Sequence, residues 1–205
     1  MIDLLFSSPL AFVIIFGGLL MSITIHEFAH CWVTDKLGDP TPRARGRLTL
    51  DPRSHLDLLG TLMILFTRFG WGKPAPFDPY NLKNPVRDTA IIAVAGPISN
   101  LLVALILSLL LKLGLFPVLW LQVAVFQIMA INIMLAIFNL VPVYPLDGSK
   151  ILTALLPQQT ALEYEEIMRR YGTLVLILLI FPFNGVSPVA RLLSPIINMV
   201  LSWLV

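Results

Sequence analysis

The chain has 205 residues, of which 57% are hydrophobic and only 13% are charged. This composition lies far outside the range of soluble domains and indicates a polytopic membrane protein. The bilayer is therefore the expected surroundings, and no nucleic-acid partner is expected. The net charge of +2 says little by itself, but nine of the fourteen Lys and Arg residues lie between Lys36 and Arg87.

The first predicted transmembrane helix covers residues 9–34, which is long enough to cross about 30 Å of hydrocarbon with some tilt. Its apolar part contains a single charged residue, Glu27, within an H-E-x-x-H motif formed by His26 and His30. Ionisable groups inside a membrane-length apolar segment are energetically costly, so this cluster is predicted to be functional.

The spacing of this motif predicts a metal site. On a helix, residues four apart lie on one face, so His26 and His30 can bind one metal ion together. Glu27 lies about 100° around the helix from His26, within reach of a water on that ion. This is the zincin arrangement, in which two imidazoles bind zinc and the carboxylate acts as general base.

Residues 43–88 are predicted to form a membrane-associated strand and loop region. Residues 45–51 partly alternate between polar and apolar side chains and are predicted as a short strand, whose edge we hypothesise captures an unwound substrate segment. Residues 58–69 are apolar but too few for a normal span, so they are predicted to be re-entrant or interfacial, with a full crossing as the alternative. His55 is expected to be a solvated or interfacial loop residue.

Two further spans are predicted at residues 89–113 and 117–140. Residues 171–205 form C-terminal hydrophobic segments, for which a hairpin, one span with an interfacial helix, and two short spans are all open. We therefore predict one membrane-embedded domain, residues 1–205, with an all-α bundle of about four to five transmembrane helices and the strand and loop region between its first two spans.

Charge predicts the orientation of this bundle. The basic residues between Lys36 and Arg87 place that segment in the cytoplasm by the positive-inside rule. The N-terminus is then outside, and the two histidines lie toward the cytoplasmic side. The third span also ends on the cytoplasmic side, which brings Asp147 to the depth of the histidines, provided that residues 58–69 do not cross.

A catalytic zinc site takes three protein ligands and a water, so a third ligand is required. Asp147 is the outstanding candidate because it follows an apolar span and lies between Pro145 and Gly148. These neighbours allow a sharp turn of the backbone at membrane depth, which is tolerated where it is buried in protein or faces a water-filled cavity.

Three motifs follow one another along the chain: H-E-F-A-H at 26–30, G-P-I-S-N at 96–100 and N-L-V-P-V-Y-P-L-D-G at 139–148. In this order they resemble the site-2 protease family of intramembrane zinc metalloproteases. The W-G-K-P-A-P stretch at 71–76 also resembles a loop of its short bacterial and archaeal members. The likeness covers residues 17–155, and no PDZ-like insertion is present, as in the minimal forms.

The resemblance implies that one zinc ion is bound by His26, His30 and Asp147 and that Glu27 is the general base. It also implies that Asn139 helps to hold the scissile carbonyl or stabilises its oxyanion, with Asn100 as a second polar group near the site. Asn139 could instead cap a helix, and Asn100 could instead hold helices together. Members of the family cleave transmembrane segments of membrane-anchored substrates, so the expected partner is a single-span membrane protein.

Two other functions compete with proteolysis. An inactive zinc-binding relative that escorts membrane proteins would have no need for Glu27. A metal transporter would usually show internal repeats and ligands spread along a path. Neither feature is found here, since the candidate ligands converge at one depth.

Overall fold

The computed structural model describes residues 2–67, 69–182 and 185–205, and it confirms the prediction of an all-α membrane protein. Apart from short turns and loops, the described chain is helical. In chain order its helices are α1 (Ile2–Ser7), α2 (Pro9–Lys36), α3 (Thr41–Ala44), α4 (Pro52–His55), α5 (Leu58–Thr67), the 3₁₀ helix η1 (Pro79–Asn81), α6 (Pro85–Lys112), α7 (Leu119–Asn139), α8 (Asp147–Leu155), α9 (Gln158–Ile180) and α10 (Pro188–Leu204).

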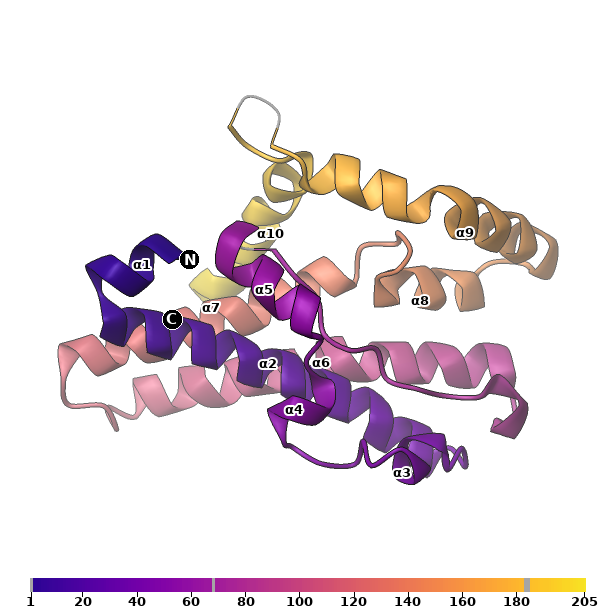
Figure 1. Cartoon of the computed structure of the whole chain (residues 1–205), viewed down its shortest axis with the longest axis horizontal. Helices are drawn as coiled ribbons and strands as arrows, with labels where there is room; N and C mark the ends of the chain where they lie inside the picture. Colours follow the sequence, from indigo (N-terminus) through magenta and orange to yellow (C-terminus); the bar gives the residue numbers. More distant parts are fainter. Residues whose placement is uncertain (1, 68, 183–184) are drawn as a thin grey trace.

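Three helices of the described chain, α2, α6 and α7, are long and apolar enough to cross a bilayer. They coincide with the three predicted spans and pack against one another as a bundle (Figure 1). Helices α2 and α6 both have proline within their first turn, where its fixed φ suits a helix and its missing N–H costs nothing. The sequence predicts about four to five transmembrane helices, so one or two further spans remain a prediction.

Close packing of small and apolar side chains holds the three spans together. Ala104 of α6 packs with Met129 and Ile133 of α7, and all three are fully buried. Helix α2 approaches α7 so closely at Gly18 that a Cβ there would lie 2.7 Å from Ile128 Cγ1. In lipid, where apolar burial drives little association between helices, such close contact supplies much of the attraction.

The strand predicted at residues 45–51 is wrong. This segment is a turn and loop between α3 and α4, and no strand is assigned in the described chain, which has only an isolated bridge between Leu56 and Gly72. Gly46 turns the chain with a φ of +64°, and the Arg47 side chain is buried instead of alternating outward. Local alternation of polar and apolar residues therefore did not reflect a pleated backbone here.

Helix α5 covers only part of the apolar stretch at residues 58–69. Its ten residues rise about 15 Å, which is half the thickness of the hydrocarbon core. The chain then folds back along it, since a Cβ on Gly70 would collide with the carbonyl oxygen of Gly60. This length and the reversal fit the predicted re-entrant or interfacial segment.

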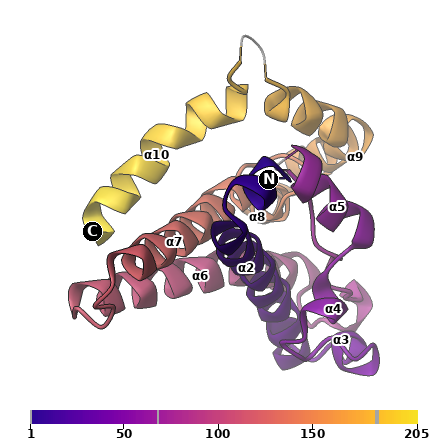
Figure 2. The same cartoon turned by 60° about the vertical axis from the view of Figure 1, so that its left-hand side comes forward.

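The C-terminal part of the chain forms α8, α9 and α10. Helix α9 begins at Gln158, so the charged segment before residue 171 and the apolar segment after it belong to one helix. Helix α10 contacts both α9 and α7 (Figure 2). Helix α8 packs on α6, and this contact brings its first residue, Asp147, to α2.

Candidate metal centre

His26 and His30 lie one turn apart on α2, and both are buried. Helix α2 is continuous through the motif, so the spacing of four places both rings on one face, as the sequence predicts. Their Nε2 atoms are 3.0 Å apart, and the rings meet edge to face.

Asp147 completes a compact group with the two histidines. Its Oδ2 lies 3.1 Å from His26 Nε2 and 3.2 Å from His30 Nε2. One ligand atom from each residue lies within 4.8 Å of the others, so the three could hold one metal ion. The chain turns tightly here, since a Cβ on Gly148 would collide with the carbonyl oxygen of Leu140.

The hydrogen bonds at the Nδ1 atoms of the two imidazoles determine whether their Nε2 atoms can bind a metal ion. His26 Nδ1 lies 2.7 Å from Asn100 Oδ1, and His30 Nδ1 lies 2.7 Å from the carbonyl oxygen of Ile92. Both oxygens only accept, so each Nδ1 carries the hydrogen and each Nε2 presents a lone pair. Two lone pairs and a carboxylate therefore converge, a donor set that fits a divalent cation.

Asn100, predicted as a polar group near the site, holds His26 in place. It is fully buried on α6, and its Nδ2 donates to the carbonyl oxygen of Ser22 and to Asn132 Oδ1. Asn132 of α7 in turn donates from Nδ2 to Ser22 Oγ at 2.9 Å. The network links all three spans and fixes which side of the Asn100 amide faces the ring.

Asn132 carries no motif signal and is missing from the predicted site. The available signal was its type and place, because a lone amide in an apolar span usually hydrogen-bonds to another span. Which helix it would meet could not be read from the sequence.

The surroundings of Gly96 explain why the G-P-I-S-N motif begins with glycine. Helix α6 passes the metal group at this residue, where a Cβ would lie 2.5 Å from both His26 Cε1 and His30 Nε2. Pro97 follows inside the continuous helix. The small residue therefore lets the backbone of α6 form one wall of the group.

Glu27 lies beside the group and is partly buried. Its Oε2 is buried and has no hydrogen-bond partner among the described residues. An extended segment passes over it, since a Cβ on Gly72 would lie 3.4 Å from Glu27 Cγ. The buried Arg47 guanidinium holds this segment by donating to the carbonyl oxygens of Lys73 and Pro74. A carboxylate oxygen with no competing partner is free to accept a proton.

The expectation of a solvated or interfacial His55 is wrong. The residue is fully buried, and its Nε2 lies 2.7 Å from the carbonyl oxygen of Thr49. Its own carbonyl oxygen accepts from the Lys73 N–H, so it helps to hold the segment over Glu27. Burial keeps the pKa of His55 below its ordinary value.

Asn139 is not linked to the metal group by any hydrogen bond in the described chain. It is the last residue of α7, and its Nδ2 donates to the carbonyl oxygen of Leu135 at 2.9 Å. The C-cap of α7 is Leu140, so this contact is a hydrogen bond within the last turn of the helix.

Known proteins resemble this chain over most of its length. A Bacillus subtilis protein named "Putative zinc metalloprotease YwhC" is 36% identical over 184 residues, which is 82% of this chain and 80% of the relative. The chain belongs to peptidase family M50. The family model, described as Peptidase family M50, matches residues 119–179. M50 is the site-2 protease family, so the resemblance drawn from the three motifs is confirmed.

Two further relatives are longer than this chain. A Mycobacterium tuberculosis protein named "Putative zinc metalloprotease Rip2" is 35% identical over 145 residues, which is 67% of this chain and 55% of the relative. A "Zinc metalloprotease" of Methanocaldococcus jannaschii is 24% identical over 188 residues, which is 46% of its length. No solved structure gives a significant match.

Proposed function

We propose that this M50 protein is an intramembrane zinc endopeptidase that hydrolyses peptide bonds within or near the transmembrane segments of single-span membrane proteins. His26, His30 and Asp147 would hold one zinc ion. One observation carries the proposal: three acceptor atoms converge in a bundle of apolar helices beside Glu27 Oε2, which has no hydrogen-bond partner among the described residues. Family membership supports peptide hydrolysis, and the names of the relatives support zinc.

In the proposed peptide hydrolysis, the zinc ion and Glu27 have different roles. Zinc, when bound, supplies Lewis-acid catalysis and makes water acidic enough to act as a nucleophile near neutral pH. Glu27 accepts the proton of the attacking water at Oε2 and returns it to the leaving amine. Its partner-free state in the described chain keeps this oxygen available for both transfers.

The two asparagines have different proposed roles. Asn100 uses both ends of its amide inside the protein, so we assign it to positioning His26. Asn139 is proposed to donate to the oxyanion of the substrate, which requires its Nδ2 to leave the carbonyl oxygen of Leu135 when substrate binds. The proposed substrate-capturing edge at residues 45–51 is withdrawn, since no strand forms there.

We also propose that the metal group lies toward the cytoplasm and that the N-terminus lies outside. The support is the run of basic residues between the first two spans, which begins at Lys36 and ends at Arg87. Labelling single cysteines placed at Ser7 and Arg45 with a membrane-impermeant reagent tests this orientation, after the native Cys31 has been replaced by Ala.

The deciding experiment is cleavage in liposomes of a single-span substrate that contains helix-breaking residues. Wild type, Glu27→Gln and Asp147→Ala are compared for turnover and for bound zinc. We expect Glu27→Gln to keep zinc and to lose at least about a hundredfold in turnover, because the general base is removed. Asp147→Ala should lose both zinc and activity.

The same experiment separates the competing functions. A wild-type protein that binds zinc but cleaves nothing, with Glu27→Gln behaving identically, would favour an escort protein. Zinc flux into the liposomes that depends on Asp147 would favour a transporter. Either result would overturn the proposal.

A further inference from the structure

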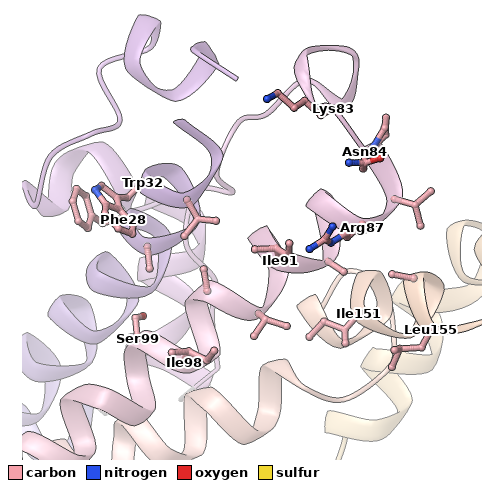
Figure 3. Close-up of a pocket in the computed structure, with 18 of the residues that line it drawn as sticks. Phe28, Trp32, Lys83, Asn84, Arg87, Ile91, Ile98, Ser99, Ile151 and Leu155 are labelled. Carbon is pink, nitrogen blue, oxygen red and sulfur yellow. The ribbon is translucent and has the colours of Figure 1, made fainter. Parts of the chain in front are cut away.

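A large groove lies beside the metal group and is separate from it. It has a volume of about 1160 Å³ and runs between the second half of α2, the first half of α6 and helix α8 (Figure 3). None of His26, Glu27, His30 and Asp147 lines it. Its walls are apolar, with Trp32 of α2 and Ile98 of α6 about half exposed along it.

One end of this groove is basic. Lys83 and Arg87, at the start of α6, line its mouth together with Asn84 (Figure 3). All three are exposed, and in the described part of the chain neither cation forms a salt bridge. Lys36, at the end of α2, lies 5.8 Å from the ring centre of Trp32 and adds a third positive charge nearby. Among the residues that the structure describes, no acidic side chain lines the groove.

The basic mouth and the apolar walls follow one another along α6, a helix long and apolar enough to cross a bilayer. The mouth lies where α6 begins, and the groove continues along α6 from Arg87 to Leu102, about 22 Å for a helix. One leaflet of hydrocarbon is about 15 Å thick, so this length reaches from the head groups through a whole leaflet. The groove thus has the polarity and depth of a single lipid.

We propose that this groove binds one anionic phospholipid of the surrounding bilayer. The acyl chains lie along the apolar walls, and the phosphate is held by Lys83 and Arg87. Basic pockets between transmembrane helices are suited to anionic head groups, and charged hydrogen bonds to phosphate are strong. A substrate helix is the less fitting occupant, because the residues of the metal group do not line the groove.

The fluorescence of Trp32 can report which lipid occupies this site, because Trp32 lines the groove and is half exposed. The other three tryptophans, Trp71, Trp120 and Trp203, are replaced by Phe, and Glu27→Gln is included so that binding is measured apart from proteolysis. The full-length protein is placed in vesicles of three parts phosphatidylcholine to one part phosphatidylglycerol. Two preparations are compared. Bromine, which quenches tryptophan fluorescence, is placed on the acyl chains of phosphatidylcholine in one and of phosphatidylglycerol in the other.

Brominated phosphatidylglycerol should quench Trp32 several times more than its share of the bilayer predicts. Lys83→Gln and Arg87→Gln should each reduce this preference by up to about fivefold, and the double variant should abolish it. Lys112→Gln is the matched control, because it removes an exposed cation from the opposite end of α6. A protein with Trp120 as its only tryptophan should report the bulk composition.

A second variant tests the walls of the groove. Ala95→Phe fills space that the acyl chains would occupy, so it should lower quenching of Trp32 by either lipid. Equal quenching by the two lipids, or a preference that survives in the double variant, would show that Lys83 and Arg87 hold no phosphate and would overturn the proposal. Absence of quenching by both lipids would show that protein fills the groove, and this too would overturn it. Size-exclusion profiles confirm that each variant is folded.

Discussion

The backbone of Gly96 lies directly against His30: a Cβ at this position would be 2.5 Å from His30 Nε2, the atom that faces Asp147. Gly96→Ala should therefore displace the imidazole. Overpacking of this kind costs about 1–3 kcal/mol, so zinc affinity should fall by about fivefold or more. Competition with a fluorescent zinc chelator measures the change.

Gly17→Ala is the matched control for this variant. Gly17 is also inside a transmembrane helix, and a Cβ there meets nothing within 4 Å. It should leave zinc affinity unchanged. If Gly96→Ala bound zinc as tightly as Gly17→Ala, the close approach of α6 would have no bearing on the metal group.

Asn132 should influence the metal group although it touches none of its ligands. Asn132→Ala removes one of the two acceptors of the Asn100 amide and leaves the longer hydrogen bond to the carbonyl oxygen of Ser22, so the orientation of Asn100 against His26 is held less firmly. Loss of such outer contacts typically lowers metal affinity by about 10–100-fold, and Asn100→Ala should reach the upper part of this range. Zinc titration of both variants checks whether Asn100→Ala loses more zinc affinity than Asn132→Ala. Asn139→Ala is the control that should bind zinc normally.

Arg47 should control the segment that covers Glu27. Arg47→Ala removes the charged donor shared by the carbonyl oxygens of Lys73 and Pro74. Hydrogen bonds to charged groups contribute about 1.5–3 kcal/mol, so the segment should open at least about tenfold more often. Amide hydrogen exchange of residues 71–77 measures this opening. Arg53→Ala should change nothing there, since the Arg53 side chain is exposed and pairs with Asp51.

Asp39 should make the protein sensitive to acid. The residue is fully buried at the end of α2 and accepts hydrogen bonds from Thr41, Asp78 and Asn81. Burial acts to raise its pKa, but these hydrogen bonds hold the pKa below its ordinary value. Its contribution to stability is thus complete above the unfolded pKa of about 3.9 and is lost as pH falls toward the lower folded pKa.

The variant Asp39→Asn tests this dependence. Its thermal unfolding midpoint should lie below that of wild type at pH 7, and the gap should narrow as pH falls below about 4. A gap that stayed constant down to pH 3 would show that the Asp39 carboxylate is not the group that titrates. Asp3→Asn, which removes an exposed carboxylate, is the control expected to follow wild type.

Much of the fold and part of the site could be predicted because their signals are local. Hydropathy and length located α2, α6 and α7, since a bilayer requires long apolar helices whose backbone bonds are satisfied internally. The spacing of His26 and His30 set their common face, since helix geometry relates residues four apart whatever surrounds them. Asp147 could be selected because few acids follow an apolar span.

Tertiary structure decided what depends on distant neighbours. Residues 45–51 look like a strand, but the buried Arg47 is drawn inward by carbonyl oxygens 26 and 27 residues away. Asn132 joins the site only because α7 packs beside α2 and α6. The basic groove likewise forms where α2, α6 and α8 meet. Periodicity in the sequence determines which face a side chain takes, whereas packing of separate helices determines what that face meets.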